Sequence, residues 1–419
     1  MGIRKEVLVS TLDQALLSLA NFLVGVFLIK NATKSDYGSY VLAYAIILFV
    51  VGVQNALINT QMIVLSPQKE LHAQRRFCAS LGIGQYLIFT PLILTCLFAI
   101  WVADHFDLFT IHNVSLIYAA GVAIFGVLLR EFYRSYFFLI LRPGLVLIVD
   151  ICHVLALFTC LFVVKSLFPE MLHVLAIVSL GMASLASGLL AMAISKMPMR
   201  IGLREILSSL SESKVHGRWA LGGVTITWIQ DQSYVYLLSL LAGTAATAEA
   251  SAARLFLSPI ALLNAGFTRV LVPRWVHLRR DGDIVGIKRT AFKAKSVLII
   301  TIIAYVLTVL WVKDYVIRVF LTKEYMNIGL LIILWGLLFM IQSIRSNYAS
   351  LLQVFHEFRN ITLANLKSAI TVIVLSIFMI AQYGPSGSIA AQLVGELILT
   401  MLMVKIFRKV AGNVDSPTK

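Results

Sequence analysis

The residues of this chain best suited to bind a charged substrate are arginines placed inside long apolar stretches. Arg254 lies in the apolar segment 250–272, while Arg130 and Arg134 are four positions apart and therefore share one face of a helix. Arg345 lies in a further apolar segment. The planar guanidinium group binds anionic groups through paired hydrogen bonds, and an arginine inside such a segment is a functional candidate. These four residues predict a cavity that binds an anionic substrate.

Each arginine also has a structural interpretation, which the sequence leaves open. Arg254 could snorkel to the membrane surface or pair with Glu249. Arg130 and Arg134 lie near the end of their segment, so they could instead contact anionic lipid.

Acidic residues in the same apolar segments predict a site for a coupling proton or Na⁺. Asp13 and Asp231 are expected near the cytoplasmic ends of their segments, where they could also pair with arginines, meet water or contact a helix N-terminus. Asp150 and His153 are three positions apart on one helical face. They could relay a proton, or they could form a structural hydrogen bond between helices.

Amide side chains complete the set of candidate cavity residues. Gln14, Asn21 and Gln232 could line the cavity or form interhelical hydrogen bonds. Walker A, H-E-x-x-H and G-x-S-x-G motifs are all missing, and the eight histidines are dispersed. The sequence therefore predicts no catalytic residues, metal site or cofactor. The four cysteines lie far apart in apolar runs, which indicates buried free thiols.

Composition indicates that the elements positioning these residues are membrane-spanning helices. The chain has 419 residues, 59% of them hydrophobic and 13% charged, with a mean hydropathy of +0.90. Soluble proteins carry about a quarter charged residues, so we predict an all-α integral membrane protein. A net charge of +15 without a basic patch interleaved with aromatics argues against nucleic-acid binding. The twelve candidate spans are 7–29, 39–65, 77–102, 114–138, 143–164, 171–195, 219–242, 250–272, 296–313, 328–353, 361–381 and 388–407.

The connections between the spans predict the orientation. One alternate set, with both termini, carries 25 Lys and Arg residues, and the other set carries 6. The positive-inside rule places both termini in the cytoplasm. The basic segment 196–218 is predicted to be a cytoplasmic linker between a six-helix half, 1–195, and a second half, 219–419. It could be a short interfacial helix or a solvated connector.

A polar stripe repeats between the two halves. Ser10, Gln14, Ser18, Asn21 and Gly25 fall on one face of the first span, and a related set begins at Asp231, 218 positions after Asp13. Six plus six helices in one orientation imply two pseudo-symmetric halves around a central cavity, as in alternating-access transporters.

Several motifs resemble one transporter family. Segments 36–42, 254–273 and 311–361 resemble corresponding regions of polysaccharide and O-antigen-unit flippases, which belong to the multidrug/oligosaccharidyl-lipid/polysaccharide exporter superfamily. The run into the last span is similar to that family's Y-G-x-x-G-x-x-x-A turn, and reads Tyr383-Gly384-Pro385-Ser386-Gly387-Ser388-Ile389-Ala390.

The resemblance implies transfer of an undecaprenyl-diphosphate-linked oligosaccharide across the bacterial cytoplasmic membrane for surface or exopolysaccharide synthesis. The expected partners are this lipid-linked substrate, membrane lipids, a polysaccharide polymerase and export machinery. One alternative is a proton- or sodium-coupled multidrug exporter of the same superfamily. Another is a membrane glycosyltransferase or polysaccharide polymerase, which the short outward loops 103–113 and 313–327 disfavour.

Overall fold

The computed structural model describes residues 3–106, 114–198, 200–320, 328–355 and 357–415. These residues form helices joined by short connections, with no strand among them. Parts of the loops 103–113 and 313–327, which are predicted to face outward, and of the motif segment 311–361 lie outside the described residues. The all-α fold predicted from composition is confirmed.

The described residues of the first part of the chain form seven α-helices, with a π-helical turn, Asn55–Asn59, between α2 and α3. Pro143 occupies the first turn of α6, where its missing N–H leaves no intrahelical bond unmade. The helices are α1 (Ile3–Asn31), α2 (Lys34–Gln54), α3 (Thr60–Leu65), α4 (Leu71–His105), α5 (Val114–Leu139), α6 (Pro143–Leu167) and α7 (Leu172–Ser195).

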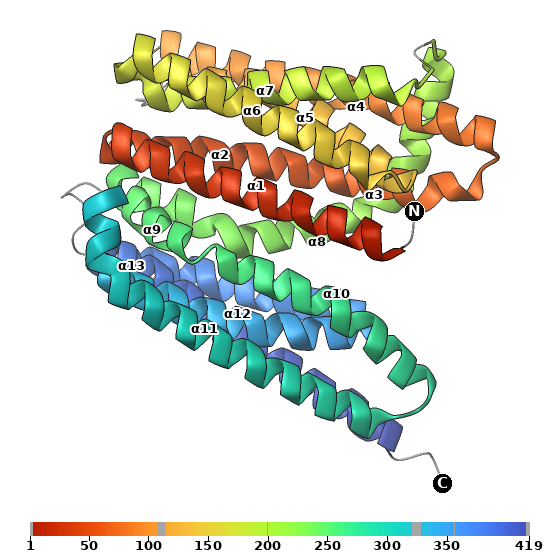
Figure 1. Cartoon of the computed structure of the whole chain (residues 1–419), viewed down its shortest axis with the longest axis vertical. Helices are drawn as coiled ribbons and strands as arrows, with labels where there is room; N and C mark the ends of the chain where they lie inside the picture. Colours follow the sequence, from red (N-terminus) through yellow and green to blue (C-terminus); the bar gives the residue numbers. More distant parts are fainter. Residues whose placement is uncertain (1–2, 107–113, 199, 321–327, 356, 416–419) are drawn as a thin grey trace. The chain divides into compact units, whose positions relative to one another are not determined.

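In the second part, the described residues form six α-helices, some of them long or broken (Figure 1). A bend of 47° separates α9 from α10, and Gly384, with a φ of 53°, interrupts α13 next to Pro385. Glycine tolerates a positive φ, and proline has no N–H to continue the helix. The helices are α8 (Leu203–Ala242), α9 (Thr244–Phe256), α10 (Pro259–Arg280), α11 (Ile284–Phe320), α12 (Gly329–Val354) and α13 (Phe358–Asp415).

All twelve predicted spans are helical, and only 250–272 is broken, at Leu257–Ser258. Within the described chain, nine helices are long and apolar enough to cross a bilayer, or ten with the bent α9–α10 pair. That count treats residues 359–410 as one helix, although this helix contains two predicted spans, 361–381 and 388–407, on either side of Gly384. It leaves out α8, because Gln230, Asp231 and Gln232 interrupt its apolar residues.

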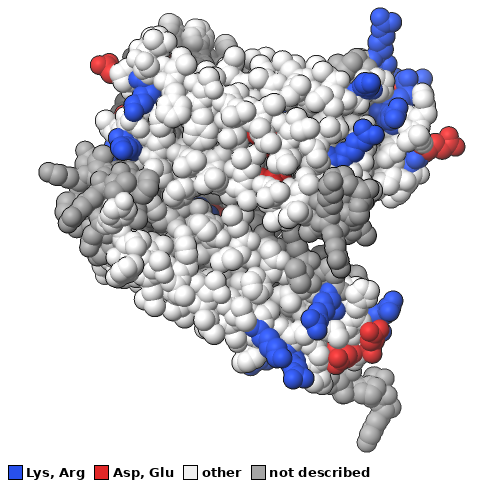
Figure 2. Space-filling view, viewed as in Figure 1, with Lys and Arg blue, Asp and Glu red and all other residues white. Residues whose placement is uncertain are grey.

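The contacts divide the chain into two compact units. Unit 1 comprises Met1–Leu23 and Ser39–Thr225, and unit 2 comprises Val24–Gly38 and Ile226–Lys419. On the face that Figure 2 shows, both units are largely uncharged, and most of the charged side chains gather toward the helix ends. That distribution suits helices with lipid around their middle. The domain ranges 1–195 and 219–419 remain predictions.

From Leu203 onward, the predicted linker is the first part of the continuous helix α8. Arg76 pairs with Glu205 at a short distance of 2.5 Å, and this hydrogen bond lowers the pKa of Glu205. Lys69 pairs with Glu212 at 2.9 Å. Both pairs lie within unit 1, so they fasten the beginning of α8 to that unit.

Helices α5 and α7 pack closely along their length in unit 1. A Cβ atom at Gly126 would lie 2.3 Å from the backbone oxygen of Gly181 and 2.8 Å from the backbone nitrogen of Leu185. Backbone atoms cannot rotate away as side chains can, so this close approach requires glycine.

We expect Gly126→Ala to separate α5 from α7 and to lower the stability of the protein by about 2 kcal/mol. Gly144→Ala is the matched control, since a Cβ there meets nothing within 4 Å. Thermal unfolding of the purified proteins in detergent measures both. Equal stability of the two variants would contradict the predicted close packing.

Candidate functional site

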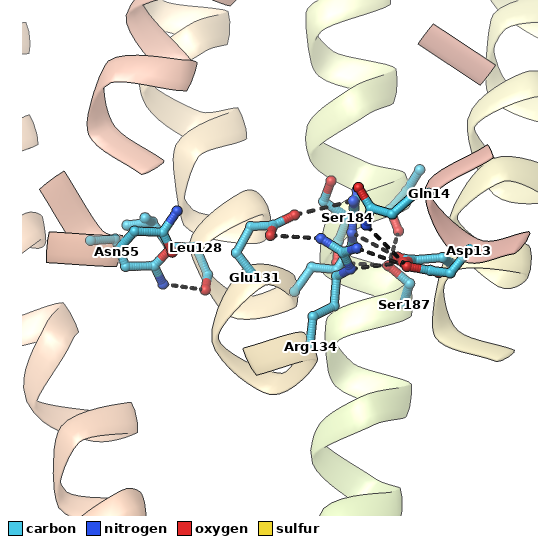
Figure 3. A network of polar contacts seen from close by, with 12 residues as sticks. Asp13, Gln14, Asn55, Leu128, Glu131, Arg134, Ser184 and Ser187 are labelled. Atoms are coloured by element: carbon cyan, nitrogen blue, oxygen red, sulfur yellow. Dashed lines mark hydrogen bonds and ion pairs between the residues drawn. The ribbon is translucent and has the colours of Figure 1, made fainter. Parts of the chain in front are cut away.

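Unit 1 holds a buried network of charged side chains from three helices, here called the unit 1 cluster: Asp13 of α1, Arg130, Glu131 and Arg134 of α5, and Asp150 of α6 (Figure 3). Asp13 and Asp150 are completely buried. A hydrocarbon environment makes isolated charges costly, so such residues are expected to pair.

Arg134 is the centre of this network. Its Nε donates to Asp150 Oδ2 at 2.7 Å, its Nη1 to Glu131 Oε2 at 2.8 Å and its Nη2 to Asp13 Oδ2 at 3.2 Å. Arg130 lies 3.1 Å from Glu131 and 3.3 Å from Asp150. The two predicted arginines therefore meet two of the predicted acids, and a third acid joins them.

The predicted site residues do not include Glu131, although its spacing from Arg134 indicates that the two side chains meet. It lies three positions before Arg134, a separation at which helical side chains meet. His153 is buried on α6, but in the described part of the chain no hydrogen bond joins it to Asp150. Asp150 is held by the arginines instead.

Unit 2 holds a smaller polar network, here called the unit 2 cluster. Arg345 of α12 donates to Glu396 of α13 at 2.7 Å, and Gln230 of α8 donates to the other oxygen of Glu396 at 3.0 Å. Glu396 is 2% exposed. Asp231 lies near enough to interact electrostatically with both Arg345 and Glu396. The predicted residue Arg345 is therefore already bonded to a carboxylate.

Removing that carboxylate should leave Arg345 unpaired. We expect Glu396→Gln to reduce stability by about 2 kcal/mol, less than for a fully buried pair because the Arg345 side chain is 21% exposed. The double variant Arg345→Met with Glu396→Leu should recover most of this loss. Denaturant titration of the three proteins measures the effect, and a double variant less stable than the single one would count against the pairing.

Arg254 of α9 has a different environment. Its Nη1 donates to the Tyr234 hydroxyl at 3.1 Å. Its guanidinium carbon lies 5.4 Å from the centre of the Tyr234 ring and 5.2 Å from that of Trp335. The Trp335 indole is itself fixed by a 2.9 Å bond to the backbone oxygen of Ala250. The guanidinium is therefore held against aromatic faces.

No carboxylate among the described residues lies within ion-pairing distance of Arg254. Glu249, its candidate partner, pairs with Lys34 instead. Tyr234 and Trp335 are both buried aromatics, and no sequence spacing signalled that they would meet Arg254. Arg254 is therefore a half-buried cation that forms no ion pair with a described carboxylate, although Asp231 interacts with it electrostatically.

The remaining predicted residues are less involved in these networks. Gln14 donates to Asp13 at 3.4 Å, Asn21 is exposed, and Gln232 is half-buried on α8. Asp231 is half-buried and interacts electrostatically with Arg254. The described residues hold no group of three or more His, Cys, Asp or Glu side chains that could bind a metal ion.

The known proteins to which this chain is similar are found by structure. No protein-family model matches the chain, and no curated protein sequence is similar to it. The lipid II flippase MurJ in an inward closed conformation superposes with a TM-score of 0.75 at 14% identity, covering 97% of this chain and 90% of MurJ.

Two further solved structures are transporters of the MOP superfamily, an abbreviation for multidrug/oligosaccharidyl-lipid/polysaccharide. An inward-facing multidrug resistance MATE transporter gives a TM-score of 0.71 at 11% identity, covering 96% of each chain. A transporter from Pyrococcus furiosus, described as having a binding pocket of reverse polarity, gives 0.65 at 11% identity, covering 98% of this chain and 95% of that one. This chain therefore has the fold of the MOP superfamily of transporters.

Proposed function

We propose that this protein is a flippase that moves an undecaprenyl-diphosphate-linked oligosaccharide across the bacterial cytoplasmic membrane. The proposal rests on a fold shared with MurJ, a lipid II flippase, and with MATE transporters. The family resemblance of the sequence motifs favours the lipid-linked sugar over a drug. The product would supply a polymerase and export machinery for surface polysaccharide, and both termini would lie in the cytoplasm.

The environment of Arg254 is the observation that favours an anionic substrate. The Arg254 guanidinium donates to Tyr234 but to no described carboxylate, so its other donors can bind a ligand, and its planar fork matches phosphate oxygens. Arg130, Arg134 and Arg345 are bonded to carboxylates. Their contact with a diphosphate would require that it displace those carboxylates, so we assign Arg254 the first contact.

Alternating access through a central cavity would solve the physical problem of this substrate. A diphosphate-sugar headgroup cannot cross hydrocarbon without polar partners, whereas its lipid tail can stay in the bilayer. Gln14, Asn21 and Gln232 would contact sugar hydroxyls along that cavity. Contact of these three amide side chains with the substrate is part of the proposal.

The unit 1 cluster favours a coupling role for its acids. It contains three carboxylates and two guanidinium groups, and Asp13 and Asp150 also interact with each other. A bound proton or Na⁺ would balance the additional negative charge, with Asp13, Asp150 and the nearby His153 as candidates, and with Asp231 in unit 2. The same feature supports the alternative function, a cation-coupled small-molecule exporter.

Transfer measured in proteoliposomes separates the two functions. Vesicles containing the protein and a fluorescent undecaprenyl-diphosphate oligosaccharide are treated with an impermeant quencher, and the protected fraction is followed with time. A flippase exposes the inner pool, whereas empty vesicles retain it. Uptake of a cationic dye on a proton or sodium gradient, without lipid transfer, would instead identify the exporter.

A further inference from the structure

A groove with a volume of about 500 Å³ lies in unit 1 beside the first half of α8. Leu57 and Ile58 of the π-helical turn, Ile88 of α4 and Leu210 of α8 form part of its apolar floor. Lys214 and Arg218 of α8 also line it. The site combines a long apolar surface with two cationic side chains.

Two anchoring contacts of α8 hold this groove in shape. Near Gly84, a Cβ atom would lie 2.9 Å from Leu210 Cγ and 3.0 Å from Ile206 Cγ2, so the missing side chain lets α8 approach α4. At the π-helical turn, the Ser213 hydroxyl donates to the backbone oxygen of Leu57. These two contacts hold the first half of α8 against α4 and against the π-helical turn, the two elements that line the groove with it.

The acidic residues of this part of α8 are already neutralised by other basic residues. Glu205 pairs with Arg76 and Glu212 pairs with Lys69, and neither acid lines the groove. Lys214 and Arg218 are both exposed and lie four positions apart, so they share one face of the helix. Within the described residues, no carboxylate forms an ion pair with Lys214. The groove consequently has a positive rim.

The rim lies where α8 changes from polar to apolar residues. Segment 203–218 is rich in charged and hydroxyl side chains, and the apolar residues of the predicted span begin at 219. Basic side chains on the cytoplasmic side of a spanning helix attract the anionic lipids of that leaflet. Their stems can lie along apolar surface while the charge stays at the interface.

We propose that this groove binds an anionic phospholipid of the cytoplasmic leaflet. The phosphate lies between Lys214 and Arg218, and an acyl chain follows Leu57, Ile58 and Ile88. A phospholipid fits better than the lipid-linked sugar, because the described residues that line the groove include no amide side chain and a single hydroxyl, that of Ser211, for a carbohydrate. The site is independent of the proposed transport function.

Native mass spectrometry of the full-length protein, titrated with phosphatidylglycerol or phosphatidylcholine, tests the site. We expect Lys214→Gln with Arg218→Gln to weaken phosphatidylglycerol binding about 30-fold, and each single change to weaken it about 5-fold. Arg204→Gln, an exposed change earlier on the same helix, should have less than a twofold effect. Unchanged binding by the double variant would overturn the proposal.

A second variant tests the apolar floor without changing any charge. Ile88→Trp should fill the groove and reduce phosphatidylglycerol binding at least 5-fold, while Leu87→Trp, at the neighbouring exposed position of α4, should not. Equal affinity for phosphatidylcholine, or tighter binding of undecaprenyl diphosphate than of phosphatidylglycerol at this groove, would also overturn the assignment. The readout is binding, so loss of transport does not affect it.

Discussion

Arg254→Ala should lower the rate of oligosaccharide-lipid transfer about 100-fold while the protein still inserts and folds. The change removes the one predicted arginine that is not bonded to a carboxylate among the described residues. Losing a desolvated charged contact to a diphosphate corresponds to about 2.7 kcal/mol for that factor. The proteoliposome quenching assay measures the rate, and gel filtration and helical content establish folding.

Conservative variants distinguish substrate binding by Arg254 from a structural role. Arg254→Lys keeps the charge but loses the planar fork, so we expect about a 10-fold loss. Tyr234→Phe keeps the ring and removes one hydrogen bond, so transfer should change by less than about threefold. Arg280→Ala removes a cation whose side chain is 77% exposed and should leave the rate unchanged. Wild-type transfer by Arg254→Ala would refute the assigned role.

Arg134→Met should produce the largest loss of stability, about 4 kcal/mol. Arg134 contacts three carboxylates, two of which are completely buried, and within the described chain it is the cation that pairs with Asp13. A buried carboxylate that loses its counter-charge pays the full cost of leaving water. Denaturant titration of the detergent-solubilised protein measures this loss.

A double-mutant cycle identifies the source of the effect. Arg134→Met with Asp13→Asn removes both members of one pair, so it should be more stable than Arg134→Met alone. Arg204→Met, which changes an exposed arginine at the start of α8, should be within about 0.5 kcal/mol of the original protein. If Asp13→Asn destabilises the Arg134→Met protein further, the ion pair is not the cause.

The sequence by itself determined the class of the protein and its elements. Apolar segments of spanning length, and the turn motif at 383–390, show which stretches of the chain can lie in lipid. This information is local, so all twelve segments are correctly predicted as helical, including the striped helix that contains Asp13. The break within 250–272 was missed, although Pro259 stands beside it.

The tertiary structure decided which charges meet. The contact between Arg134 and Asp13 joins residues 121 positions apart, and it depends on how far each helix is rotated and shifted along its axis. Side-chain packing sets those two quantities, and helical periodicity does not encode them. For the same reason, the sequence could not distinguish an ion pair between Arg254 and Glu249 from contact of Arg254 with a substrate. In the structure Glu249 pairs with Lys34, and the Arg254 guanidinium lies against the rings of Tyr234 and Trp335.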